Sequence, residues 1–413
     1  MGNFIVNLQA RGFIKQMSHA AEIAELFSRE KVTCYVGFDP TADSLHVGHL
    51  MPIFFAKHLQ QAGHRPFFVV GGGTVMAGDP SGKEEMRGLM TVDEIATFKA
   101  GIRLQLERFL DFGEGQAMLL DNADWLLKLN YVQFLRDIGV HFSVNRMLQA
   151  ECYKVRMSRP DAGLSFIELN YMILQSYDFL HLYRTYNCKL QFGGDDQWSN
   201  ILSGADLIRR VDRGEAFALT LPLLETTDGK KMGKTEVGTV WLDPERTSPF
   251  EFYQFWRNTH DGDVINFLSL FTLLPMDEVL RWKSASGKEL NNAKQLLAFQ
   301  VTKLIHGEAA ANLAQATALA LFASGGDDSA MPTTFVSEEE LKGGLLITEA
   351  LVRTGLCSSN SDARRLIQGN GLTINGERPS NHEYRLTLDD LQDGKVTLRK
   401  GRKDYHALRL QAP

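Results

Sequence analysis

Short apolar runs alternate with longer segments of helical periodicity through the first half of the chain. The runs are typical of buried strands, and the segments between them place apolar residues every three to four positions. Strands are predicted at 33–38, 66–73, 117–126 (a strand followed by a turn) and 188–194, and helices at 47–62, 91–112 and 164–187. This alternation predicts a parallel α/β sheet wound by right-handed crossovers. Such sheets bind ligands at the carboxyl ends of their strands.

The second half of the chain follows a different pattern. Residues 248–322 have helical periodicity throughout, and residues 323–344 have the Gly-, Ser- and acid-rich composition of a linker. The tail beyond them reads as two short helices followed by short strands. We therefore predict a Rossmann-like parallel-sheet domain over 1–230, a helical domain over 231–322, a linker over 323–344 and a small α+β domain over 345–413.

The composition is that of an ordinary globular protein, with 44% hydrophobic and 23% charged residues among 413. None of the four cysteines lies in a C-x-x-C pair, which disfavours a zinc site or a disulfide framework and favours a reducing cytosol. No apolar run is long enough to span a membrane, and the N-terminal residues lack the apolar core of a signal peptide. We therefore expect a cytoplasmic protein without membrane contact.

The net charge of −6 is unevenly spread along the chain. The segment from Leu346 to Pro413 carries 11 Lys/Arg and 8 Asp/Glu, a net charge of +3, so the rest of the chain carries −9. A mildly basic tail on an acidic body indicates a polyanionic partner that the tail contacts.

The sequence LHVGH (45–49) follows the first predicted strand and opens the next helix. His46 and His49 are three residues apart, so they lie on one face at the helix start, where free backbone N–H groups suit an anion. Gly48 leaves room for a flat ring to approach the backbone. A metal site would need a third ligand, and none is evident nearby, so no metal ligand is predicted. Taken alone, a histidine pair at a helix start is more often structural than catalytic.

The sequence DGKKMGKTEVG (228–238) concentrates three lysines in a glycine-flanked loop. By itself a short lysine run is usually a solvated turn. Mobile ammonium groups also suit a leaving pyrophosphate, whose charge builds only in the transition state. The familiar phosphate loops do not match, because AGDPSGKEE (77–85) lacks the first glycine and the Ser/Thr of a P-loop, and GGGTVMAG (71–78) lacks the G-x-G-x-x-G spacing.

Together, LHVGH and KMGKT resemble the HIGH and KMSKS motifs of the class I aminoacyl-tRNA synthetases. Tyr171, Gln175 and Asp178 share one face of a predicted helix, since they are spaced i, i+4 and i+7. This polar stripe, together with Tyr35 in the first strand and the loops GDPSG and GGDDQW, resembles the bacterial tyrosyl-tRNA synthetases. The resemblance implies an enzyme that activates tyrosine with ATP and Mg²⁺, giving tyrosyl-adenylate and pyrophosphate, and then transfers tyrosine to tRNA(Tyr).

The resemblance also implies roles for individual residues. The phenol hydroxyl of the substrate is held by Tyr35 and Asp178, and its amino group by Tyr171, Gln175 and Asp79. Asp196 and Gln197 contact the ribose and the region of the substrate carboxylate. ATP binding is assigned to Asp39, Thr41, His46, Gly48, His49, Asp196, Lys231 and Lys234, and catalysis to Thr41, His46, His49, Lys231, Lys234 and Thr235. The histidines stabilise phosphate oxygens, and the lysines close over the β and γ phosphates.

Three positions depart from the family pattern. Val36 replaces a cysteine beside the ribose, Asp195 replaces a serine and adds a second carboxylate beside Asp196, and KMGKT lacks both serines of the wider motif. None of these departures removes a catalytic group.

The tail sequence ITEALVRTGLCSSNSDARRLIQGNGLTINGE (347–377) resembles an RNA-binding domain shared with a small-subunit ribosomal protein. Arg364 and Arg365, on a helix expected to begin after Ser361, are the predicted contacts to RNA phosphates. The family also implies a homodimer. Two alternatives remain open: a tryptophanyl-tRNA synthetase, in which the second histidine of LHVGH is usually asparagine, and a non-catalytic RNA-binding protein that kept the fold.

Overall fold

The computed structural model describes residues 4–40, 42–76, 91–158, 163–224, 234–235, 238–322, 331–392, 394–401 and 404–411. The chain divides into two compact units, one made of residues 1–225 with 265–281 and the other of residues 226–264 with 282–413. Among the described helices, none is both long and apolar enough to cross a membrane.

A six-stranded sheet forms the centre of the first unit, with the strand order β1-β6-β5-β2-β3-β4. Its strands are β1 (Gln16–Met17), β2 (Thr33–Phe38), β3 (Arg65–Val70), β4 (Met118–Asp121), β5 (Cys188–Gly194) and β6 (Phe217–Leu221). Neighbouring strands from β6 to β4 run parallel, and β1 pairs with β6 antiparallel at the edge. The predicted strands and the parallel α/β sheet are therefore confirmed.

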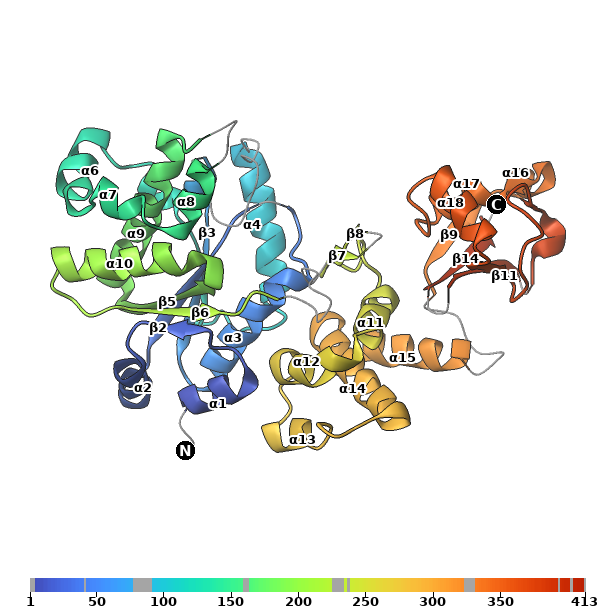
Figure 1. Ribbon diagram of the computed structural model, residues 1–413, viewed down its shortest axis with the longest axis horizontal. Coiled ribbons are helices and arrows are strands. Elements are labelled where there is room, and N and C mark those ends of the chain that lie inside the picture. Colours follow the sequence, from blue (N-terminus) through green and yellow to red (C-terminus); the bar gives the residue numbers. More distant parts are fainter. Residues whose placement is uncertain are drawn as a thin grey trace. The chain divides into compact units, whose positions relative to one another are not determined.

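Helices cover both faces of this sheet, with α9 and α10 on one side and α3 on the other (Figure 1). The α-helices are α1 (Phe4–Arg11), α2 (Ala20–Arg29), α3 (Leu50–Gln61), α4 (Val92–Leu106), α5 (Ala123–Leu126), α6 (Tyr131–Asp137), α7 (Val144–Met147), α8 (Glu151–Met157), α9 (Phe166–Tyr186) and α10 (Trp198–Val211). Short 3₁₀ turns are η1 (Val47–His49), η2 (Thr74–Met76), η3 (Gly139–His141) and η4 (Asp195–Gln197).

Residues that commonly begin or end helices do so in this structure. Thr91 caps α4 in a capping box with Glu94, the sequence pattern of a threonine followed three residues later by a glutamate. The helix after the first strand stops before Gly63, whose φ of 89° lies in the left-handed region. The long helix α9, predicted at 164–187, is buried on several faces, with Tyr171, Met172 and Phe179 all inside. It is therefore a central helix, and three of its polar residues are buried: Glu168, Ser176 and Asp178.

Residues 265–281 belong to the first unit and contain most of α12 (Val264–Phe271) and all of α13 (Met276–Leu280). The buried guanidinium of Arg11 donates to the carbonyl oxygens of Ser269 (3.0 Å), Thr272 (3.3 Å) and Leu274 (2.6 Å). These carbonyls lie at and just beyond the carboxyl end of α12, where helix carbonyls lack partners of their own. Arg11 thereby fastens this segment to the amino-terminal helix.

The second unit is mainly helical between residues 248 and 322, as the periodicity predicts, and a short hairpin precedes its helices. Its elements before the tail are the hairpin strands β7 (Lys234–Thr235) and β8 (Gly238–Thr239), the helices α11 (Pro249–Arg257), α14 (Gly287–His306) and α15 (Glu308–Phe322), and the turn η5 (Asp261–Asp263). The helices α11, α14 and α15 pack against one another around fully buried side chains such as Trp256 and Leu297.

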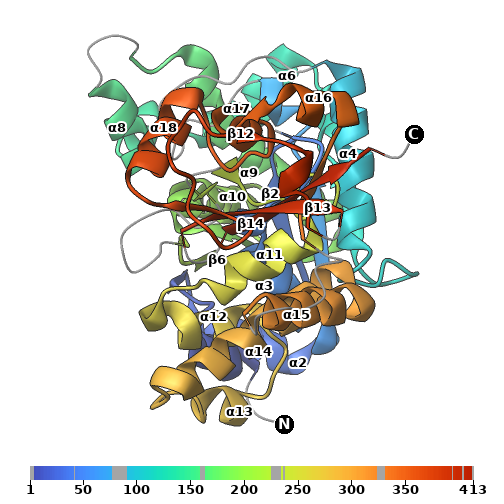
Figure 2. The same ribbon diagram turned by 90° about the vertical axis from the view of Figure 1, so that its right-hand side faces the viewer.

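The tail forms a second sheet, with the strand order β11-β13-β14-β9 and helices α17 and α18 along one side (Figure 2). Its elements are β9 (Thr333–Val336), α16 (Glu338–Gly343), β10 (Leu345–Leu346), α17 (Ile347–Arg353), α18 (Asn360–Gln368), β11 (Leu372–Ile374), β12 (Arg385–Leu386), η6 (Leu388–Asp390), β13 (Lys395–Lys400) and β14 (Asp404–Leu410). The helix α18 begins before the expected position, because Ser359 is its N-cap.

Part of the predicted linker belongs to this folded tail. The strand β9 pairs in parallel with β14, and α16 buries Leu341 in the same apolar core as Val396 and Leu408. The composition misled here because α16 starts with three glutamates that favour a helix amino terminus, where negative charge is stabilising. The other predicted domain limits remain predictions.

Candidate functional site

Four neighbouring parallel strands, β5, β2, β3 and β4, end at the same edge of the sheet. Their ends are followed by polar or glycine-rich turns: Asp39 after β2, the glycines 71–73 after β3, and Asn122 after β4. At this edge the backbone of Gly72 lies very close to the side chain of Asp121, since a Cβ on Gly72 would lie 2.3 Å from an oxygen of Asp121. The glycines therefore let the strand ends converge around a common site, as the sheet topology predicts.

The hydroxyl of Tyr35 lies at the bottom of this site. Tyr35 is on β2, only 2% exposed, and its ring lies 5.3 Å from that of Phe179. The hydroxyl is buried and has no hydrogen-bond partner within the described part of the chain. Burial, and next the nearby carboxylate of Asp178, raise the pKa of Tyr35 well above its ordinary value, so it stays a neutral phenol. A buried hydroxyl without a partner is costly unless a ligand supplies one.

Asp178 is the neighbouring buried acid, on α9. Its Oδ1 accepts from the indole Nε1 of Trp125 at 2.7 Å, and its Oδ2 accepts from Nδ2 of Asn122 at 2.9 Å. Burial raises the pKa of Asp178 to about 7, the two donors oppose that rise, and the charge of Asp121 adds to it. The carboxylate is therefore oriented by two neutral donors and has no cation against it in the hydrogen bonds described.

Asn122 and Trp125 are residues that the sequence analysis missed. Asn122 connects two parts of the site, because its Oδ1 accepts from the backbone N–H of Gly73 at 2.7 Å while its Nδ2 donates to Asp178. Trp125 is held in place by stacking on His181, with ring centroids 4.4 Å apart. Their position directly after a strand of the parallel sheet was the available signal, since ligands meet such sheets there.

The stripe predicted on the long helix is present on α9. Tyr171 is buried, and Gln175 is half-buried with its side-chain oxygen Oε1 enclosed and without a hydrogen-bond partner in the described structure. Both lie on the same helical face as Asp178, one and two turns before it. The sides of the site thus present further polar groups suited to a polar ligand, in addition to Tyr35 and Asp178.

His46 and His49 form a reciprocal cap at the start of η1. The ring Nδ1 of His46 accepts from the backbone N–H of Gly48 at 3.0 Å, and Nδ1 of His49 accepts from the backbone N–H of His46 at 3.1 Å. Because a neutral imidazole that accepts through Nδ1 carries its proton on Nε2, each ring offers an N–H donor on its far side. The two rings are adjacent, with centroids 4.1 Å apart. Two directed donors beside a helix start suit a phosphate.

The turn η4 supplies Asp196 and Gln197 after β5. Asp196 is exposed, and the side-chain oxygen of Gln197 accepts from Nδ2 of Asn200 at 3.2 Å. Asp195 places a second carboxylate beside Asp196 in this turn, and its Oδ1 accepts from Gln16 and Thr220. Asp195 is therefore bound to the edge of the sheet.

Some predicted site residues lie outside the described residues, namely Thr41, Asp79 and Lys231. Lys234 and Thr235 form the backbone of β7, and their side chains are also outside the described part. The tail arginines are described: Arg364 and Arg365 are both exposed on α18, with Arg365 4.0 Å from Asp362.

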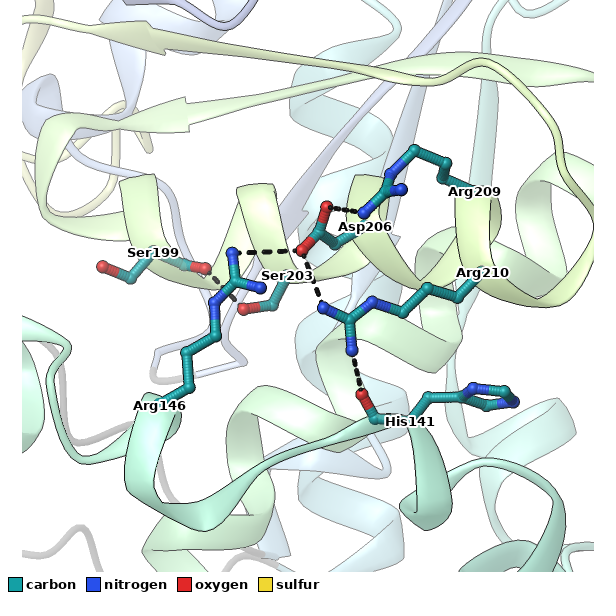
Figure 3. Close-up of polar contacts among 7 residues, drawn as sticks. All are labelled: His141, Arg146, Ser199, Ser203, Asp206, Arg209 and Arg210. Atoms are coloured by element: carbon teal, nitrogen blue, oxygen red, sulfur yellow. Dashed lines mark hydrogen bonds and ion pairs between the residues drawn. The ribbon is translucent and has the colours of Figure 1, made fainter.

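A separate basic pocket lies between α7 and α10 in the first unit (Figure 3). The carboxylate of Asp206 meets three arginines, Arg146 (3.3 Å), Arg209 (3.1 Å) and Arg210 (3.4 Å), so the cluster keeps an excess of positive charge. Arg210 also donates to the carbonyl oxygen of His141 at 2.6 Å. The cavity has a volume of about 330 Å³, and its walls include hydroxyls and cations from these residues: Ser143, Arg146, Ser199, Ser203 and Arg210.

Known proteins resemble this chain along its whole length. The family model for tRNA synthetases class I (W and Y) matches residues 28–323, and that for the tyrosine–tRNA ligase SYY-like C-terminal domain matches residues 326–408. The tyrosine–tRNA ligase of Acetivibrio thermocellus is 53% identical over 99% of this chain and 100% of its own length. The chain belongs to the tyrosine–tRNA ligase family of class I tRNA synthetases.

Other members of this family extend the likeness. The tyrosine–tRNA ligase of Clostridium beijerinckii is 51% identical over the full length of both chains. Among solved structures, a C-terminally truncated mitochondrial tyrosyl-tRNA synthetase from Aspergillus nidulans is 28% identical, with a TM-score of 0.68 over 76% of this chain and 93% of that one. A tryptophanyl-tRNA synthetase from Encephalitozoon cuniculi, at 13% identity and a TM-score of 0.55, shares the fold.

Proposed function

We propose that this synthetase activates tyrosine with ATP and transfers it to tRNA(Tyr). The observation that carries the choice of tyrosine is the pair formed by the unpartnered Tyr35 hydroxyl and the oriented carboxylate of Asp178. A substrate phenol can accept from Tyr35 and donate to Asp178, which satisfies both groups. Phenylalanine would leave the buried Tyr35 hydroxyl unpaired, at a cost of roughly 1–3 kcal/mol, and would give the Asp178 carboxylate no donor beyond Trp125 and Asn122.

The first step needs positioning and charge stabilisation. The tyrosine carboxylate is already ionised at neutral pH, so it attacks the α-phosphate of ATP without a general base. The Nε2–H donors of His46 and His49 would meet the phosphate oxygens as charge develops on them. Lys231 and Lys234, with Thr41 and Thr235, would meet the pyrophosphate, while Asp39 and Asp196 hold the nucleoside and Gly48 gives it room.

Magnesium would arrive with ATP as part of the substrate. In the residues that the structure describes, no group of three or more His, Cys, Asp or Glu side chains is arranged to hold a metal ion. Mg²⁺ commonly binds through substrate phosphates and retains several waters, so a dedicated protein cage is not required. The ion shares the neutralisation of the phosphates with the lysine loop.

Tyrosine affinity should depend on pH near neutrality. Asp178 accepts the hydrogen bond of the substrate hydroxyl most strongly when it is ionised, and its pKa in the free enzyme is raised to about 7. Tyrosine affinity should therefore be constant above that pH and fall below it, approaching tenfold per pH unit. Equilibrium binding of tyrosine without ATP, from about pH 5.5 to pH 8, measures this without involving the nucleotide site. An affinity that stays constant over this range would contradict the assignment of Asp178.

We also propose that tRNA contacts both units. The exposed arginines of α18, Arg364 and Arg365, suit the phosphates of one part of the RNA. The pocket lined by Arg146 and Arg210 suits another part, since guanidinium groups and hydroxyls together bind phosphate oxygens well. The first residue of α10 that lines this pocket is Ser199, two residues after Gln197 of the tyrosine site.

The pocket is tested by Arg146→Ala. Arg146 is 68% exposed, so its loss should leave the fold intact, while the KM for tRNA should rise by about tenfold because one charged contact is lost. The matched control is Arg209→Ala, which removes an arginine from the same Asp206 carboxylate but not from the pocket lining. Equal effects of the two variants on tRNA charging would contradict this placement of the RNA.

We further propose a homodimer that works in the cytoplasm. Large apolar side chains are exposed on two adjacent elements of the first unit, including Val132 (73%) on α6 and Val140 (70%) on η3. Clustered exposed apolar side chains mark interaction surfaces. Sedimentation should show a mass near twice that of the chain, and Val132→Glu should shift it toward the monomer.

The four unpaired cysteines fit a reducing compartment.

A further inference from the structure

The carboxylate of Asp195 joins the substrate-binding turn to the edge of the sheet. Asp195 opens η4, directly before Asp196 and Gln197. Its Oδ1 accepts from Nε2 of Gln16 at 2.6 Å and from Oγ1 of Thr220 at 2.8 Å. Gln16 and Thr220 lie directly opposite each other on the antiparallel pair β1 and β6. A single carboxylate oxygen is thus bound by both members of a cross-strand pair.

This arrangement fixes the turn from one side. Thr220 is fully buried near the end of β6 and pairs with Gly193 of β5, so it offers a rigid point of attachment. On the other side the turn closes tightly, because a Cβ on Gly194 would lie 2.5 Å from an oxygen of Asp196. Gln197 is then oriented by Asn200 at the start of α10. Asp196 and Gln197 therefore lie between Asp195, which is bound to the sheet, and Asn200, which is bound to Gln197.

We infer that Asp195 is a positioning residue for adenylate formation, which acts by holding Asp196 and Gln197 in place. The inference rests on the proposed function of those two residues. Charged acceptors form the stronger hydrogen bonds, and an ionised carboxylate accepts several at once. Small displacements of groups that orient a reacting substrate have large kinetic effects, since the reaction depends on their alignment. The rate of the first step should therefore depend on bonds that lie outside the substrate site.

The test compares variants that remove either partner of the hydrogen bond between Asp195 and Gln16. Asp195→Ala and Gln16→Leu should each lower the rate constant for tyrosyl-adenylate formation, by about tenfold for Asp195→Ala. Tyrosine affinity should change less than the rate, because Tyr35 and Asp178, which hold the phenol, are on other elements. Asp195→Asn should recover most of the rate, since its side-chain oxygen can still accept from both donors. The double variant Asp195→Ala/Gln16→Leu should be no slower than Asp195→Ala, because the two residues act through one contact.

Several results would overturn the inference. An unchanged rate in Asp195→Ala would do so, as would an equal loss in Asp195→Asn and Asp195→Ala, which would indicate that the charge itself acts on the substrate. If Asp195→Ala fails to fold, Gln16→Leu and Thr220→Val decide the question, and normal rates in both would overturn it. The proposed function fails separately, if the unmodified protein shows no tyrosine-dependent exchange of pyrophosphate into ATP.

Discussion

Replacing His46 by alanine should lower the rate constant for tyrosyl-adenylate formation by about 10²–10³-fold, the usual effect of losing one donor to charge that develops in a transition state. Tyrosine affinity should remain nearly unchanged, because His46 lies on η1 and the phenol partners lie on β2 and α9. Single-turnover measurements of adenylate formation, together with equilibrium binding of tyrosine, separate the two quantities.

A matched variant separates catalysis from helix capping. His46 accepts from the backbone N–H of Gly48, so alanine removes a cap as well as the Nε2–H donor. Asparagine is a favoured N-cap residue and keeps an acceptor near that N–H, but it has no donor at the position of Nε2. His46→Asn should therefore be nearly as slow as His46→Ala. A rate close to that of the unmodified protein in His46→Asn would show that the histidine is only a cap.

Removing the tail should separate the two reactions of the enzyme. A chain that ends at Gly326 keeps α15 and loses the whole second sheet, including β9, which a cut after Leu341 would leave without its partner strand. Adenylate formation should persist, because Tyr35, Asp178 and the histidines belong to the first unit. Charging of tRNA should fall by about 10²-fold or more, since two charged contacts at about 1.5–3 kcal/mol each are lost with Arg364 and Arg365.

The remaining charging should be sensitive to salt, because phosphate contacts release counterions. Pyrophosphate exchange and tRNA charging are measured on the same truncated protein. The double variant Arg364→Ala/Arg365→Ala serves as the control, since both side chains are exposed and the tail should stay folded. A parallel loss of both reactions in the truncated chain would contradict the assignment of the tail to RNA alone.

Features set by local sequence were predicted well. Periodicity identified β2, α9 and their neighbours, and local capping signals placed the start of α4 at Thr91. The parallel direction of the strands from β6 to β4 follows from the alternation of strands and helices, because a helical crossover connects parallel strands. Tyr171, Gln175 and Asp178 could be grouped in advance, since helical spacing alone places them on one face.

Features that depend on contacts between residues far apart in the sequence could not be predicted. Trp125 and Asn122 act on Asp178 more than fifty residues away, and no periodicity connects them. The attachment of Asp195 to Gln16 joins residues 179 positions apart, and only the pairing of β1 with β6 brings them together. A lone polar residue in a turn reads as solvated until the opposing strand is known.

The central claim is that a buried hydroxyl–carboxylate pair, Tyr35 and Asp178, selects tyrosine for activation by ATP. Its most direct test is pyrophosphate exchange into ATP, measured with each of the twenty amino acids at the same concentration. Efficient exchange with tyrosine alone, lost in Asp178→Ala, is the predicted result. Exchange with phenylalanine or tryptophan as fast as with tyrosine would contradict the account.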